Sequence, residues 1–178
     1  AIKPLADSDW TPASGDAAIL GRCYHVSLPS GAEITVIPYA RALSHGVAFD
    51  GWLHDGAQMA QRLVDAGRDY PLVLLATDGE SYGHHHPKGE MALSYVIEDL
   101  EHREDVNLTN LASWIAAHPP EFSARIKAPS SWSCVHGVER WRGDCGCAMD
   151  PASGQHQRWR APFRDALDTL REAATGAV

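Results

Sequence analysis

The stretch Leu72-Val-Leu-Leu-Ala-Thr-Asp-Gly-Glu-Ser-Tyr-Gly-His-His-His86 decides the fold that we predict for this chain. Its first five residues are apolar, and an uninterrupted run of this length is typical of a strand buried on both faces of a parallel sheet. Two acids, three imidazoles and two glycines follow directly. In α/β proteins, ligands bind at the C-terminal ends of such strands. Although Asp-Gly alone is a turn signal, this concentration of polar groups favours a functional site.

Strand and helix patterns alternate along the rest of the chain. Residues 1–20 lack a clear period and form a predicted loose lead-in, after which Cys23–Leu28 and Glu33–Tyr39 alternate as the two strands of a hairpin. Helical spacing predicts helices that begin near Asp55, Pro87, Thr109 and Pro162, short strands at 106–108 and 124–128, and a long loop from Ser130 to Met149. Strands that alternate with helices indicate an α/β fold with parallel pairing.

Length and composition limit the classes of function. The chain has 178 residues and 19.3 kDa, which predicts one domain over 1–178. Its net charge of −8, with no basic stripe, argues against nucleic acid as a partner. No run approaches the roughly 18 apolar residues of a membrane span, and no leader pattern is visible, so we expect no membrane association. Four cysteines are few for a disulfide scaffold, which favours a reducing, cytoplasmic setting.

A second informative stretch runs from Ser130 to Cys147. Its metal-ligating side chains are Cys134, His136, Cys145 and Cys147. Three thiols and one imidazole form an accepted structural zinc set, although the usual spacing inside each pair is two to four residues rather than one. The alternative is a loop whose cysteines are small buried groups. Trp132 and Trp141 could be flat platforms for sugar rings, with His136 and Arg140 as hydrogen-bond donors, or they could fill a core.

Both stretches resemble parts of a known enzyme family. Residues 77–86 resemble the fourth sequence region of the family 57 glycoside hydrolases, and residues 131–147 are similar to a stretch in a poorly characterised subgroup of that family. The resemblance runs from about Tyr24 to Leu170. It implies a (β/α)₇ barrel that acts on α-glycosides with retention of configuration, and it implies that Asp78 is the general acid/base.

The chain also departs from this family. The N-terminal His-Gln-Pro region and the glutamate nucleophile are absent, and retaining hydrolysis needs two carboxyl groups about 5–5.5 Å apart across the scissile bond. Asp78 and Glu80 leave one strand end together, so they do not easily flank one sugar. We therefore expect an α/β, partial (β/α)₇-barrel-like unit at residues 21–178, with a mostly parallel sheet, flanking helices and the N-terminal hairpin. Half a barrel exposes strand edges, which predicts a homodimer.

Three functions remain open from the sequence. The first is a glycoside hydrolase with a carbohydrate or other small-molecule substrate, in which Asp78 and Glu80 are catalytic. Its substrate-binding residues would be His84, His86, Trp132, His136, Arg140 and Trp141. An extended backbone would place His84 and His86 on the same side as Asp78, with His85 opposite. The second is a metal-dependent hydrolase in which Asp78, Glu80 and two of the three histidines, such as His84 and His86, hold a divalent ion, for example zinc. The third is a non-catalytic carbohydrate-binding or assembly module.

Overall fold

The chain divides into two compact units. The computed structural model describes residues 1–13, 15, 19–148 and 150–177. Unit 1 is Ala1–Arg125 and unit 2 is Ile126–Val178. Met149, the predicted end of the long loop, and residues 14 and 16–18 of the predicted lead-in lie outside the described residues.

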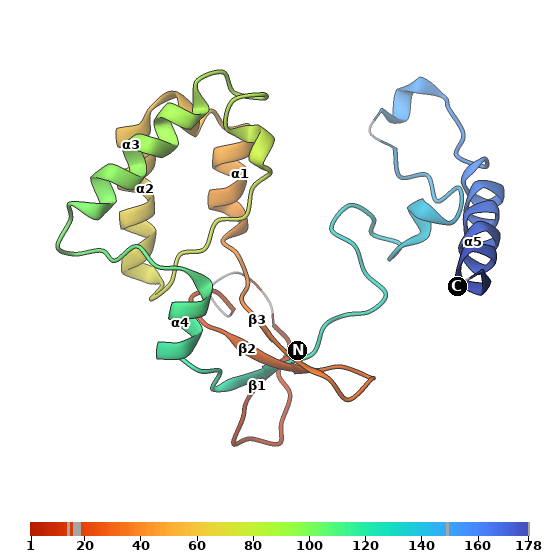
Figure 1. Cartoon of the computed structure of the whole chain (residues 1–178), viewed down its shortest axis with the longest axis horizontal. Helices are drawn as coiled ribbons and strands as arrows, with labels where there is room; N and C mark the ends of the chain where they lie inside the picture. Colours follow the sequence, from red (N-terminus) through yellow and green to blue (C-terminus); the bar gives the residue numbers. More distant parts are fainter. Residues whose placement is uncertain (14, 16–18, 149, 178) are drawn as a thin grey trace. The chain divides into compact units, whose positions relative to one another are not determined.

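Unit 1 contains a four-stranded mixed sheet (Figure 1). Its strands are β1 (Ile2–Pro4), β2 (Tyr24–Ser27), β3 (Glu33–Val36) and β4 (Phe122–Ala124), in the order β1-β4-β2-β3. The β1–β4 and β2–β3 pairs are antiparallel, and the β2–β4 pair is parallel. The prediction of a mostly parallel, barrel-like sheet was therefore wrong. β1 lies within residues 1–20, which we predicted to be a loose lead-in. The sequence did not predict this strand, because its partner β4 is more than a hundred residues away and no local pattern reveals that pairing.

The predicted hairpin is confirmed. β2 and β3 pair in register from Tyr24 opposite Val36 to Ser27 opposite Glu33. The turn closes through a 2.9 Å hydrogen bond from the Gly31 N–H to the Leu28 carbonyl. Gly31 has a φ of +83°, a conformation that glycine adopts at little cost. Alternating residues and a glycine turn are thus sufficient local signals for this element.

The apolar run Leu72–Ala76 is not a strand of this sheet. Leu72 to Leu75 are half-buried, and Leu75 packs against the helical core. The Ala40 N–H donates a 2.8 Å backbone hydrogen bond to the Leu74 carbonyl, and the Ala76 N–H donates to Ser44 Oγ at 3.1 Å. A single backbone hydrogen bond does not form a β-ladder, so the segment that we predicted as the central strand belongs to neither a strand nor a helix.

Three helices form the core of unit 1 (Figure 1). They are α1 (Arg41–Phe49), α2 (Gly56–Asp69) and α3 (Gly89–Glu101), and the short 3₁₀ turn η2 (Trp52–His54) connects α1 to α2. Asp55 caps α2 by accepting a hydrogen bond from the Gln58 N–H at 2.9 Å. The buried cluster consists of Val47, Leu53, Met59, Ala60, Val64, Ala92, Val96 and Leu100. The helical spacing that predicted α2 and α3 therefore identified most of the core.

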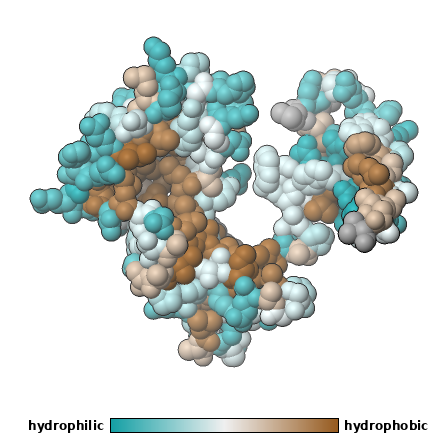
Figure 2. Space-filling view, in the orientation of Figure 1, coloured by the Kyte–Doolittle hydropathy of each residue, from teal (hydrophilic) through white to brown (hydrophobic). Residues whose placement is uncertain are grey.

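The remaining helices bury little. α4 (Leu111–Ala117) has no buried residue and is capped by Asn110 rather than by the predicted Thr109. In unit 2, α5 (Arg160–Gly176) also has none, and Figure 2 shows hydrophobic residues gathered on its surface. The predicted strand at 106–108 does not form, and the one predicted at 124–128 overlaps β4 only at Ala124, because the strand lies earlier in the chain, at Phe122–Ala124. Of the helices in the described ranges, none is both long and apolar enough to cross a bilayer.

We expect Gly46→Ala to destabilise unit 1. A Cβ atom at Gly46 in α1 would lie 2.2 Å from Cε2 of Trp52, so the indole must shift. Overpacking of this kind costs about 1–3 kcal/mol. The free energy of unfolding, measured by chemical denaturation, should fall by that amount.

The matched control is Gly67→Ala in α2, where the added Cβ meets no atom within 4 Å. Alanine loses less backbone entropy than glycine when a helix forms, so this variant should gain about 0.5–1 kcal/mol. Equal stability of the two variants would show that Trp52 does not fill the space beside α1.

Candidate metal centre

The segment 131–136 folds as a tight turn that places Cys134 inside unit 2. Ser131 and Cys134 form an antiparallel bridge, and the Ser133 N–H donates to Ser131 Oγ at 3.1 Å. Arg140, in the 3₁₀ turn η4 (Glu139–Trp141), donates from Nη1 to the Ser133 carbonyl at 3.0 Å. Cys134 is only 6% exposed as a result. Its thiol is therefore fixed by the backbone of this turn.

The other two thiols are held by a second turn. Gly146 separates Cys145 from Cys147 and has a φ of +79°, which favours glycine. Gln157, just before α5, is buried and donates from Nε2 to the Cys147 carbonyl at 2.6 Å. The Gln157 N–H donates to Asp144 Oδ1 at 3.2 Å. Hydrogen bonds from one side chain and its backbone thus fix both ends of the segment that carries these cysteines.

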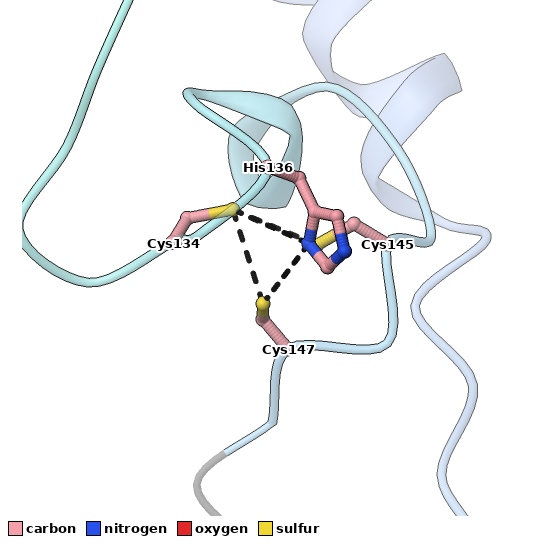
Figure 3. A group of neighbouring side chains, drawn as sticks. All are labelled: Cys134, His136, Cys145 and Cys147. Atoms are coloured by element: carbon pink, nitrogen blue, oxygen red, sulfur yellow. Dashed lines mark hydrogen bonds between the residues drawn. The ribbon is translucent and has the colours of Figure 1, made fainter.

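The two turns bring four potential ligand atoms together (Figure 3). Cys134 Sγ lies 3.9 Å from Cys145 Sγ and 3.9 Å from Cys147 Sγ. His136 Nδ1 lies 3.5 Å from Cys147 Sγ and 4.0 Å from Cys134 Sγ. All four atoms lie within 4.8 Å of one another. The predicted metal ligands of this stretch are therefore placed as one cluster.

The electrostatics of the cluster favour a thiolate at Cys134. Burial raises the pKa of this thiol, but hydrogen bonds from the Arg140 and His136 N–H groups and from the His136 ring outweigh burial and lower the pKa to about 7. The pKa of Cys147 is raised by burial and by the neighbouring thiols Cys145 and Cys134. A cation at the centre would lower the pKa of Cys147 as well, because it favours the thiolate form of every cysteine that it binds.

Gln157 is a residue of this site that the sequence analysis missed. It also accepts a 2.7 Å hydrogen bond from Arg160 Nη1, which ties the Cys145–Cys147 turn to the start of α5. No sequence motif predicts Gln157, because an isolated glutamine ten residues from the last cysteine has no characteristic spacing. Only the fold reveals its role.

Gln157→Ala is expected to weaken metal binding at the cluster. The change removes the bond to the Cys147 carbonyl and leaves a space where the buried amide lies. Loss of a partner that orients a metal ligand typically costs about 10–100-fold in affinity. A competition titration with a chromophoric chelator measures this. Gln155→Ala, at an exposed position, should bind like the unaltered chain, and equal affinities for the two variants would contradict the role of Gln157.

The predicted sugar platforms of unit 2 are exposed. Trp132 is 96% exposed and Trp141 is 47% exposed. The Arg140 guanidinium lies 5.5 Å from the centre of the Trp141 ring, but the same side chain also supports the Cys134 turn. Neither tryptophan is core filler, so the structure leaves both available to a ligand.

The stretch 77–86 of unit 1 folds as a compact turn with some side chains fixed inward. Ser81 is buried, and Thr77 Oγ1 and Tyr82 Oη share a 2.8 Å hydrogen bond. His86 Nε2 lies 2.8 Å from the Ala48 carbonyl at the end of α1. Because these contacts join the turn to the helical core, its backbone is defined although it belongs to no strand.

The acids and two histidines of this turn point outward. Asp78, Glu80, His84 and His85 are exposed, and His85 Nε2 lies 3.5 Å from Glu80 Oε2. The backbone here is a turn rather than an extended strand. The expectation that His84 and His86 share a side, with His85 opposite, was therefore wrong: the His84 and His85 rings are neighbours with centres 5.0 Å apart, and His86 turns inward.

The structure does not gather the acidic turn into a metal site. Within the described ranges, the only group of three or more His, Cys, Asp or Glu side chains placed to hold an ion is the cluster Cys134, His136, Cys145 and Cys147. His84 and His86, predicted as further metal ligands, are not part of such a group. The two predicted functional stretches lie in different units, 77–86 in unit 1 and 131–147 in unit 2.

Comparisons of the chain with protein-family models, with curated proteins and with solved structures find no match.

Proposed function

We propose that unit 2 is a zinc-binding module in which Cys134, His136, Cys145 and Cys147 hold one ion. The observation that supports this most strongly is the spacing of the ligand atoms. Ligands in a tetrahedral zinc site, at about 2.3 Å for sulfur and about 2.0–2.1 Å for nitrogen, lie about 3.8 Å apart for two sulfurs and about 3.6 Å for sulfur and nitrogen. In the structure, Cys134 Sγ lies 3.9 Å from each of the other two sulfurs, His136 Nδ1 lies 3.5 and 4.0 Å from two of the sulfurs, and the two remaining separations are within 4.8 Å.

The donor set indicates the metal and its role. Thiolates are soft ligands that select zinc, copper(I) and iron–sulfur clusters over magnesium or calcium, and imidazole suits zinc as well. Four protein ligands fill a tetrahedral site, which is the arrangement of structural zinc rather than of catalytic zinc with an open position. The ion would therefore hold the two turns of unit 2 together and would not take part in hydrolysis.

Elemental analysis tests this proposal. The full chain, purified with a reductant and dialysed against metal-free buffer, should contain one zinc ion per chain. Replacement by cobalt(II) should produce the intense visible absorption of a tetrahedral cobalt–thiolate site. Trace zinc together with no cobalt spectrum would contradict the proposal.

A second candidate function concerns the turn 77–86 of unit 1. We propose that Asp78 serves as acid/base in a glycoside hydrolase-like reaction on α-glycosides, in line with the resemblance to family 57. The arrangement of side chains within the turn favours this. Ser81, Tyr82 and His86 face the rest of unit 1, while the carboxyl groups of the turn remain exposed. A general acid must reach its substrate, and this arrangement leaves Asp78 able to do so.

A hollow beside this turn could receive the substrate. It has a volume of about 520 Å³, and Pro87 and Lys88, which directly follow the histidines, form part of its wall. Met91 and Tyr95 line it as well and are 64% and 47% exposed. Gly56 allows the Tyr95 ring to approach α2, since a Cβ there would lie 3.1 Å from the ring. A flat aromatic wall with polar neighbours is a suitable surface for a sugar.

A panel of chromogenic α-glycosides tests this second candidate, with the full chain at micromolar concentration. Turnover that a matched Asp78 variant loses would support it, and no turnover on any member of the panel would contradict it.

The predicted homodimer stays a prediction. Its argument came from the edges of half a barrel, and the observed sheet does not supply that argument.

A further inference from the structure

We propose that the cluster is also an oxidant-sensitive thiol site, in which peroxide joins Cys134 to Cys147 or Cys145 as a disulfide and thereby expels the metal. This inference concerns the regulation of the proposed zinc site and rests on it. None of the three cysteines is in a disulfide, so each has the reduced sulfur that this reaction requires.

The geometry makes Cys134 the common partner. Its Sγ lies 3.9 Å from both other sulfurs, whereas a disulfide requires about 2.05 Å. The two sulfurs must therefore approach by about 2 Å, through side-chain rotation and a shift of loop backbone. Cys145 and Cys147 lie outside the helices and strands, on either side of Gly146. A shift on this side of each pair is therefore a movement of loop residues and disturbs no helix or strand.

Differences in burial determine which cysteine is oxidised first. Cys134 is 6% exposed, whereas Cys145 and Cys147 are half-buried. Hydrogen peroxide reaches the more accessible thiols more readily, since oxidation follows exposure as well as thiolate character. Cys145 or Cys147 is thus the sulfur that peroxide oxidises first, and Cys134 is the thiol that resolves the product.

The chemistry balances with peroxide as the only co-reactant. The sulfur of Cys145 or Cys147 attacks one peroxide oxygen, the O–O bond breaks, and the products are a sulfenic acid and a hydroxide that takes a proton from solvent to become water. The Cys134 thiolate then attacks the sulfenic sulfur. An S–S bond forms, the S–O bond breaks, and the departing hydroxide is protonated to a second water. The pair of sulfurs loses two electrons in total, and these reduce one peroxide molecule to two water molecules.

Metal release follows from the ligand count. A disulfide sulfur is no longer a thiolate, so the ion keeps only His136 and one cysteine. Two protein ligands do not retain zinc as four do. A thiol reductant that restores both thiolates should restore binding.

The experiment uses the full chain loaded with zinc and treated with hydrogen peroxide. Three quantities are followed: zinc captured by a chromophoric chelator, free thiols, and the disulfide found by mass spectrometry of peptides from the unreduced protein. The expected result is one zinc released per disulfide, with two thiols lost and Cys134 present in every disulfide found. Dithiothreitol followed by zinc should reverse all three changes.

Cys23→Ser is the matched control. Cys23 lies in unit 1, is buried, and donates its thiol hydrogen to the His118 carbonyl at 2.9 Å, a bond that serine can also form. This variant should release zinc like the unaltered chain. Cys134→Ser should form no disulfide within the cluster.

Several outcomes would overturn the inference. A Cys145–Cys147 disulfide, oxidation that stops at sulfinic acid, or zinc that stays bound after oxidation would each do so. These differ from failure of the zinc proposal itself. A chain that holds no zinc but still forms a Cys134 disulfide when metal-free and reduced protein meets peroxide would refute the zinc site and leave the thiol chemistry standing.

Discussion

Cys134→Ser should abolish the proposed zinc binding and unfold the 131–157 segment while unit 1 keeps its structure. Cys134 is the most buried of the four ligands and contributes to three of the close contacts in the cluster. Structural zinc supplies about 10–16 kcal/mol of apparent binding free energy in zinc-finger peptides, and that free energy is folding free energy. Only Cys134 and Gln157 are buried among the described residues of unit 2, so a hydrophobic core cannot replace the metal there.

Zinc content and hydrogen exchange measure the two parts of this result. The variant should contain no stoichiometric zinc, and backbone amides of the 131–157 segment should exchange at rates close to those of an unfolded chain. Amides of α2 and α3 should keep their protection, because their core lies within unit 1. A chelator added to the unaltered chain should have the same local effect. Full zinc content in Cys134→Ser would refute this assignment of ligands.

The second large effect is expected at Asp78. If the chain hydrolyses α-glycosides, Asp78→Asn should lower kcat by roughly 10²–10⁴-fold, because an amide cannot donate or accept the proton as a carboxyl group does. The fold should not change. Asp78 is exposed, and its side chain does not cap the 3₁₀ turn η3 (Gly79–Ser81) that follows. Steady-state rates on the best substrate of the panel, with thermal unfolding as a check on folding, test this.

Asp69→Asn supplies the control for Asp78→Asn. It makes the same chemical change at an exposed position, the last residue of α2. Its rate should equal that of the unaltered chain. A loss of rate in both variants would indicate an effect of net charge, and no loss in either would remove Asp78 from the mechanism.

The sequence predicted those parts of the structure that local patterns determine. The hairpin follows from alternation and a glycine turn, and α2 and α3 follow from helical spacing of residues such as Met59, Val64 and Val96. The Cys/His cluster could also be predicted, because its ligands lie within fourteen residues of sequence and a short loop brings them together.

Long-range packing accounts for the errors. Five apolar residues predict burial, but they do not distinguish a sheet strand from the segment that Leu72–Ala76 forms beside α1, in which only Leu72 to Leu75 are half-buried. The pairing of β1 with β4 joins the two ends of unit 1 and leaves no trace in either short sequence. The inward turn of His86 depends on the position of the Ala48 carbonyl, which only the packed helices fix.

The absence of buried residues along α5 determines how the two units should respond to heat. Heat capacity rises on unfolding mainly because apolar surface becomes hydrated, by roughly 0.45 cal/mol/K for each Å² newly exposed. Phe163, Leu167 and Leu170 are already 41–65% exposed in the folded protein, so melting of unit 2 hydrates little new apolar surface. Its calorimetric transition should carry a small heat-capacity step and a temperature set by metal concentration, whereas the transition of unit 1 should show the larger step of a domain that loses a hydrophobic core.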